Sequence, residues 1–168
     1  MTLTLRHETE ADITTIERLT ADAFLDAPHS SHTEQFIVNA LRRAGQLSVS
    51  LVAEKDGERV GHVAVSPVTL SSGAHGWYGL GPISVLPALQ GRGIGSHLMH
   101  AALAELRAMG AAGCVLLGDP GYYGRFGFAV QPGLELPGVP AEYFQALLLK
   151  GEWPVAEVSY HKAFEATA

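Results

Sequence analysis

Residues 86–103 read LPALQGRGIGSHLMHAAL, with three glycines, Gly91, Gly93 and Gly95, just before an apolar helical pattern. Glycine weakens a helix interior by about 0.5–1 kcal/mol relative to alanine. Three glycines at alternate positions therefore predict a loop, with the helix following it and ending near Met109.

The glycine loop has the properties of an anion site. The first turn of a helix leaves backbone N–H groups without partners, and the helix dipole adds to their attraction for anions. Arg92 adds a fixed positive charge with several donors. The sequence lacks the lysine and Ser/Thr of a P-loop, and the loop follows several strands rather than opening the first βαβ unit. On glycine spacing alone, an anion site and a loop that merely turns the chain remain equally good interpretations.

Two helices are predicted early in the chain, after a short strand at Leu3 and Leu5. Thr9 followed by Asp12 indicates the start of the first helix, which "DAPHS" interrupts. Ser31 followed by Glu34 has the spacing of a capping box and predicts the start of the second helix.

Strands dominate the middle of the chain. Residues 47–54 and 59–70 alternate apolar and polar positions around Asp56-Gly57, a strong hairpin signal. Residues 77–87 predict a third strand, in which Gly81-Pro82 indicates a bulge or a departure from the neighbouring strand. The remaining expected elements are strands at 113–117, 127–130 and 153–160, a helical turn at 122–126 and a short helix at 141–149.

The expected order is β-α-α-β-β-β-α-β-α-β in a single domain covering residues 1–168. The strand–helix–strand unit at 77–117 implies a parallel pair, and the Asp-Gly hairpin implies antiparallel pairing. The predicted class is therefore α/β with a mixed sheet.

Composition excludes several classes of function. The net charge of −6 disfavours extended nucleic-acid binding, and no apolar run is long enough for a membrane span. The first residues lack the features of a signal peptide, so we expect a cytoplasmic protein. A single cysteine excludes an internal disulfide. His97 and His100 lie three apart without an apparent third ligand, so no metal site is expected.

The segments "LGPISVLPALQGRGIGSHLM" (80–99) and "YYGRFGF" (122–128) together resemble the GCN5-related N-acetyltransferase (GNAT) superfamily, including its uncharacterised predicted N-acetyltransferases. Gln90, Gly93 and Gly95 match the Q/R-x-x-G-x-G/A loop of that family. Tyr123 and its neighbours match its "FYxxxGF" pattern. The element order agrees as well, so the resemblance implies a GNAT-like acyl-CoA N-acyltransferase fold with splayed central strands.

The resemblance implies acetyl-CoA as co-substrate. The backbone N–H groups from Gln90 to Gly95 would hold the pyrophosphate, with Ser96 adding a contact. The strand before the loop would pair with the pantetheine arm. The residues assigned to the cofactor in this way are Ile83, Ser84, Val85, Gln90, Gly91, Arg92, Gly93, Ile94, Gly95 and Ser96.

The family transfers the acetyl group to an acceptor that is usually an amine, and for this chain we expect direct attack in a ternary complex. Its tyrosine in the "FY" pair corresponds to Tyr123, which we expect to protonate or hydrogen-bond the departing sulfur; packing is the alternative. Many members carry an asparagine after the fifth strand, where this chain has Asp119. Asp119 is therefore a candidate cofactor contact, although an ionised carboxylate cannot donate a hydrogen bond.

The general base stays unassigned. His62, His75, Asp119 and Glu54 are candidates, and each is expected to be a surface or solvated residue. His29 and His32 flank the break before the second helix, in a region that lines the acceptor site in the family, and we interpret them as ordinary histidine usage.

The expected acceptor is a small-molecule or peptide amine, selected in the family by segments equivalent to residues 20–45 and 131–160. No nucleic-acid or membrane partner is expected, and a homodimer is compatible with the sequence. Two alternatives remain: a non-catalytic acyl-CoA-binding or regulatory module, and a tRNA-directed toxin-type acetyltransferase, which the charge of −6 disfavours.

Overall fold

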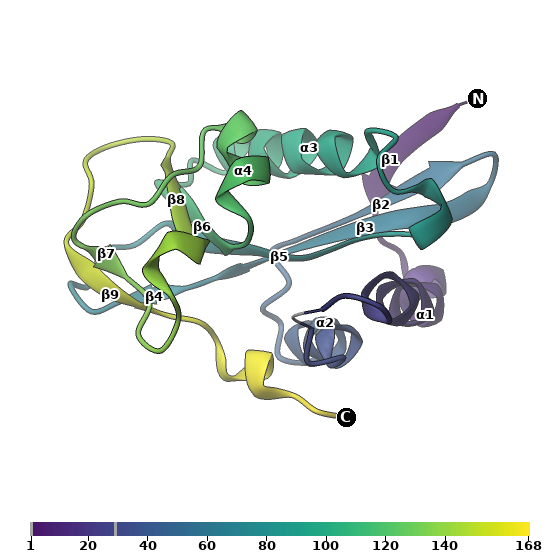
Figure 1. Cartoon of the computed structure of the whole chain (residues 1–168), viewed down its shortest axis with the longest axis horizontal. Coiled ribbons are helices and arrows are strands. Elements are labelled where there is room, and N and C mark those ends of the chain that lie inside the picture. Colours follow the sequence, from purple (N-terminus) through teal and green to yellow (C-terminus); the bar gives the residue numbers. More distant parts are fainter. Residues whose placement is uncertain (1, 29) are drawn as a thin grey trace. The chain divides into compact units, whose positions relative to one another are not determined.

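The structure is a computed structural model that describes residues 2–28 and 30–168 (Figure 1). The backbone divides into two units. The first contains Met1–Val65, Gly81–Leu103 and Lys162–Ala168, and the second contains Ser66–Leu80 and Ala104–His161. Each unit is described by itself; the expected single domain over 1–168 stays a prediction.

The first unit contains an antiparallel sheet in the order β1 (Leu3–His7), β2 (Val49–Lys55) and β3 (Glu58–Pro67). The predicted Asp56-Gly57 hairpin joins β2 to β3, with φ of 53° and 84° at its two residues. Both values suit the twist of a tight hairpin. The second part of β5 (Trp77–Val85) continues this sheet beside β3, and the Leu86 amide directly after it donates to the Val60 carbonyl at 2.9 Å.

Helices cover both faces of this sheet, as Figure 1 shows for α1 and α2 on one side and α3 on the other. The helix bounds are α1 (Ile13–Phe24), α2 (Glu34–Arg43) and α3 (Ile94–Ala108), of which α3 belongs to the first unit up to Leu103. Ile16 and Val38 pack against Val52 of the sheet. On the opposite face, Leu98 approaches Gly61 so closely that a β-carbon there would lie 3.0 Å from its Cδ1.

The two helix starts follow different rules. Thr9 and Asp12 form the predicted capping box around a 3-10 turn at Glu10–Asp12, which leads into α1. The capping box predicted from Ser31 and Glu34 is wrong. Glu34 is itself the first residue of α2, and its carboxylate accepts from the Ser30 hydroxyl at 2.8 Å, while Thr33 occupies the cap position.

The second unit contains the first part of β5, which pairs in parallel with β6 (Gly113–Leu117), and β8 (Phe144–Leu148), which pairs antiparallel with β6. A smaller sheet has the order β4 (Thr69–Leu70), β9 (Ala156–Ser159) and β7 (Leu134–Glu135). Trp77 is buried between these layers with Val115, Phe144 and Val158.

Two predictions for the C-terminal half are wrong. The helix expected at 141–149 is a 3-10 turn at Ala141–Tyr143 followed by strand β8. Helix propensity favoured Ala and Leu there, but pairing with β6 and burial of Phe144 and Ala146 outweigh it. Within the described part of the chain, the strand expected at 127–130 is reduced to one isolated bridge, between Ala129 and Ala146.

The predicted class is confirmed: the parallel β5–β6 pair and the antiparallel pairs make the sheet mixed. Within the described residues, no helix is long and apolar enough to span a membrane.

Candidate functional site

The glycine loop of residues 90–93 lies between a 3-10 turn at Pro87–Leu89 and the start of α3 at Ile94. The predicted loop is therefore shorter than expected, because Gly95 is already the second residue of α3. Gly91 and Gly93 have φ of 79° and 87°, a conformation that L side chains rarely adopt. A β-carbon on either residue would meet nothing within 4 Å. Glycine is therefore required here by backbone conformation, and the space in front of the loop is open.

The amides of this loop are available to a ligand. Among the residues that the structure describes, the N–H groups of Gly91, Arg92 and Gly93 have no acceptor. The first backbone bond of α3 runs from the His97 amide to the Gly93 carbonyl at 3.1 Å, so the amides of the first turn are free as well. These donors, with the exposed Arg92 guanidinium, fit a phosphate group.

The strand before the loop carries the other predicted cofactor residues. The Gln90 side-chain amide donates to the Val85 carbonyl at 3.1 Å, which fixes the loop to the end of β5. Ser84 is 2% exposed, and its hydroxyl finds no partner in the described part of the chain. The pairing of β5 with β6 ends at Gly79↔Val115, before Gly81-Pro82. This agrees with the prediction that the strand departs from its neighbour at Gly81-Pro82.

Asp119 caps α4 (Pro120–Tyr123), since its side chain accepts from the Gly121 amide at 2.8 Å. Its carbonyl accepts from the amides of Tyr122 and Tyr123, both at 3.0 Å. The side chain thus has a local structural role, and its contact with a cofactor stays a prediction.

Tyr123 is positioned tightly by its surroundings. A β-carbon built on Gly118 would overlap its ring, and the ring of Tyr122 meets it edge-on with centroids 4.9 Å apart. Burial, with Tyr122 and Asp119 nearby, raises the pKa of Tyr123 to about 12. Its hydroxyl has no hydrogen-bonding partner in the described chain. The phenol is therefore protonated at neutral pH and free to donate.

Of the residues considered as a general base, His62 is not solvated, whereas the Glu54 side chain keeps 27% of its surface exposed. His62 was expected at the surface, but its side chain is fully buried, and burial lowers its pKa to about 4. An imidazole of that pKa is too weak a base for an alkylammonium with a pKa near 10.4. Glu54 accepts from Arg6 at 2.7 Å.

We assign no catalytic or metal-binding role to the other histidines considered from the sequence. His75 and His32 are exposed, and His29 lies outside the described residues. No group of three or more potential metal-ligating side chains occurs in residues 2–28 and 30–168.

The first unit contains two clusters of polar side chains that the sequence did not predict. The Asp12 carboxylate is buried and accepts from Arg6 at 2.7 Å and 2.9 Å and from Arg59 at 2.8 Å. The hydrogen bond from Arg6 holds the pKa of Asp12 well below its usual range. In the second cluster, Ser50 contacts both Glu8 and His62. Alternation along β2 and β3 indicated the buried faces of these strands. Arg59, however, lies 47 residues from Asp12, and Ser50 lies 42 residues from Glu8, so no local pattern predicted these contacts.

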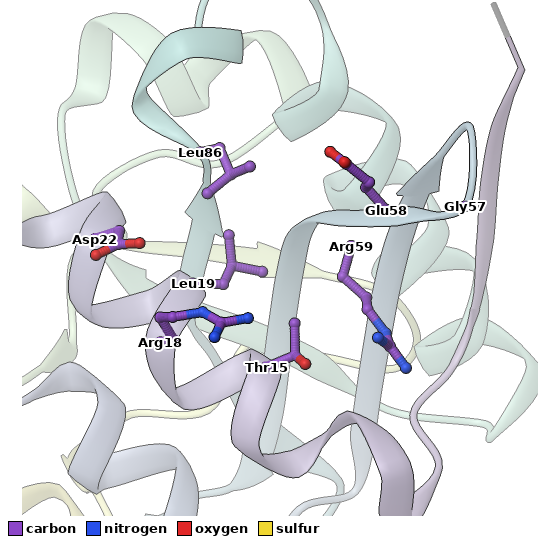
Figure 2. Close-up of a pocket in the computed structure, with 8 residues that line it drawn as sticks. All are labelled: Thr15, Arg18, Leu19, Asp22, Gly57, Glu58, Arg59 and Leu86. Atoms are coloured by element: carbon purple, nitrogen blue, oxygen red, sulfur yellow. The ribbon is translucent and has the colours of Figure 1, made fainter.

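Two hollows lie beside α1 in the first unit. The first, which we call the Arg18 hollow, has a volume of about 340 Å³ (Figure 2). Its lining comes from α1, the β2–β3 hairpin and the residue after β5: Thr15, Arg18, Leu19, Asp22, Gly57, Glu58, Arg59 and Leu86. Leu19 and Leu86 face each other across its middle, with Asp22 and Glu58 on opposite sides.

The second, the Asp26 hollow, has a volume of about 400 Å³. It is lined by the C-terminal end of α1 and the segment that follows, including Asp22, Phe24 and Asp26. Ile83 and Val85 of β5, Pro87 and Gln90 complete it. Predicted cofactor residues thus border a hollow that also contains two carboxylates.

The fold and the loop define an α/β protein with a helix start after its central strand whose free amides fit an anion. A family model described as acetyltransferase (GNAT) family matches residues 13–128, and the chain belongs to this family. An uncharacterised N-acetyltransferase of Escherichia coli K12, YhbS, is 39% identical over 108 residues, 64% of this chain. The match spans 65% of the length of that relative.

Solved structures extend the similarity over nearly the whole chain. A GNAT family acetyltransferase from Brucella melitensis, in complex with acetyl-CoA, has a TM-score of 0.87 and 47% identity, over 97% of this chain and 98% of that one. Escherichia coli YhbS in complex with CoA has a TM-score of 0.88 and 32% identity, over 99% and 93%. The expected family and fold are confirmed.

Proposed function

We propose that this protein is an N-acetyltransferase that transfers the acetyl group of acetyl-CoA to an amine by direct attack in a ternary complex. The glycine loop carries this proposal: its free amides, its two positive-φ glycines and the open space before it suit a pyrophosphate. The acetyl-CoA and CoA complexes of the two similar proteins support the choice of cofactor.

The cofactor contacts follow from the chain's own donors. The amides from Gln90 to Gly95 and the Ser96 hydroxyl would hold the pyrophosphate, and Arg92 would add a charge-assisted contact. The backbone of Ile83, Ser84 and Val85 would pair with the pantetheine amides. Pro82 cannot donate a hydrogen bond, so this pairing begins after it.

Tyr123 would stabilise the departing thiolate. A phenol with a pKa of about 12 is a weaker acid than an alkyl thiol, for which cysteine at about 8.5 is a guide. A hydrogen bond from Tyr123 to the sulfur is therefore favoured over complete proton transfer. A phenol that stays protonated can keep this role over the whole neutral pH range.

The acceptor amine must lose a proton before it attacks. An alkylamine with a pKa near 10.4 is neutral in about one molecule in several thousand at pH 7. His62, with a pKa of about 4, is too weak a base for this step. The general base stays unassigned, and desolvation of the amine would contribute to the deprotonation.

Release of free thiol from acetyl-CoA in the presence of a panel of primary amines tests the proposal, with acetylated products identified by mass spectrometry. We expect acceptor-dependent thiol release, reduced at least tenfold in kcat by Tyr123→Phe with an unchanged Kd for acetyl-CoA. Tight acetyl-CoA binding without turnover of any amine would instead favour a non-catalytic acyl-CoA-binding module.

A further inference from the structure

We propose that the Arg18 hollow and the Asp26 hollow together bind an acceptor that carries both a primary amine and a carboxylate. The carboxylate would lie at Arg18, and the amine would lie toward Asp22, Asp26 and β5. This inference rests on the proposed function and names the substrate class of the same site.

The two hollows are adjacent. Asp22 lines both of them. On the other side, Leu86 lines the Arg18 hollow, and its neighbours Val85 and Pro87 line the Asp26 hollow. All of these residues belong to the first unit. One elongated ligand can therefore lie along α1 from the β2–β3 hairpin to the glycine loop.

Arg18 is the cation available to a ligand in this groove. Arg59 is already held by the buried Asp12 carboxylate at 2.8 Å, and in Figure 2 its side chain points away from Leu86. Arg18 has no hydrogen bond or ion pair in the described part of the chain, even with Asp22 one helical turn away. Thr15, also one turn away, adds a hydroxyl donor.

The charges around Arg18 favour a carboxylate over a phosphate. A guanidinium matches the two oxygens of a carboxylate with parallel hydrogen bonds. Glu58 and Asp22 flank the hollow on opposite sides and would repel a dianion more than a single negative charge.

The other end of the groove suits an amine. The lining of the Asp26 hollow contains two carboxylates and no lysine or arginine. Neither carboxylate has a hydrogen-bonding partner among the described residues. The same lining includes Ile83 and Val85, which the proposed function places along the pantetheine arm.

The transfer step removes the charge that the acidic end attracts. The neutral amine nitrogen attacks the thioester carbonyl, a C–N bond forms and the C–S bond breaks. The nitrogen loses its second proton to solvent, and the CoA thiolate takes up one proton. The acetamide product is neutral at this end, so the carboxylates hold it less strongly than the ammonium.

Two matched series of compounds test the inference. ω-Amino acids with three to ten methylene groups are compared with n-alkylamines of equal length as acceptors of acetyl-CoA. ω-Aminoalkylphosphonates form a third arm. Binding of the same compounds to the CoA-loaded protein is measured by calorimetry, so that recognition is observed independently of transfer.

We expect the ω-amino acids to exceed the matched alkylamines in kcat/KM and in affinity by about tenfold at an intermediate length. Arg18→Gln should bring this ratio close to one. Arg43→Gln, an exposed arginine of α2 outside both hollows, should leave the ratio at its wild-type value.

Equal use of both series, or a ratio unaffected by Arg18→Gln, would overturn the inference while leaving acetyl transfer intact. A preference for phosphonates would overturn the carboxylate assignment. Carboxylate-dependent binding without thiol release would support the groove and contradict the proposed function.

Discussion

Replacing Gly93 by alanine separates two roles of this glycine: adopting a left-handed backbone conformation, and leaving space for a phosphate group at the backbone amides. Gly93 has φ of 87°, and a β-carbon there would meet nothing within 4 Å. The folded protein should therefore tolerate Gly93→Ala at the cost of the left-handed backbone alone, about 1–2 kcal/mol. In a domain of this size, 1 kcal/mol corresponds to about 2–4 °C in Tm.

Acetyl-CoA binding should respond far more strongly. A β-carbon in the open space before the loop keeps phosphate oxygens from the backbone amides. Loss of one charge-assisted hydrogen bond costs about 1.5–3 kcal/mol, which is roughly a 10- to 150-fold increase in Kd.

Gly73→Ala is the matched control. Gly73 has φ of 83° and also has nothing within 4 Å of a β-carbon, but it lies in a turn after β4. We expect similar losses of Tm in the two variants and weaker acetyl-CoA binding, measured by calorimetry, in Gly93→Ala only. Equal Kd values would refute the reasoning, as would a much larger loss of Tm in Gly93→Ala.

Three further predictions follow from side-chain geometry. Gly118→Ala should displace the Tyr123 ring and lower kcat at least tenfold, whereas Gly124→Ala, which faces open space, should stay within about twofold; equal kinetics would contradict the positioning of Tyr123 by Gly118. Asp12→Asn should reduce the free energy of unfolding at pH 7 by about 3 kcal/mol, because it breaks a buried ion-pair cluster. The Asp12 pKa is lowered on folding, so urea titrations should show this difference shrinking as pH falls below about 4, and a constant difference would count against it. Burial lowers the pKa of His62 from 6.5 to about 4, so the wild type should lose roughly 2–4 kcal/mol of its free energy of unfolding as the pH falls through this range. Tm measurements over the same pH range should show a smaller loss in His62→Gln.

Local signals in the sequence located the glycine loop, although α3 already begins at Ile94 and includes Gly95. Gly91 and Gly93 adopt backbone conformations that the alternate glycines predicted, and α3 starts where the apolar pattern starts. The Asp56-Gly57 hairpin and the end of the β5–β6 pairing before Gly81-Pro82 are likewise encoded within a few residues. Such features depend on the φ preference of a residue and on whether it has a backbone N–H donor, and both are intrinsic properties of that residue.

Features that depend on distant partners were not predictable. Strand β8 is formed from residues that favour a helix in isolation, because β6 offers a pairing edge. The burial of His62 depends on Ser50, Glu8 and the helices that cover its face of the sheet. The Arg18 and Asp26 hollows combine residues of α1 with residues of the β2–β3 hairpin and β5, which lie far from α1 in the sequence, so no short motif predicts them.

Backbone NMR tests the central claim, that the start of α3 holds the pyrophosphate of acetyl-CoA, most directly. On titration with CoA, the amide resonances of Gly91 to Ser96 should show the largest shift changes, accompanied by those of Ile83 to Val85. The amide of Gly73, in the control turn, should stay unchanged. Unperturbed amides at Gly91 to Ser96 at saturating CoA, with shifts concentrated elsewhere, would contradict the account.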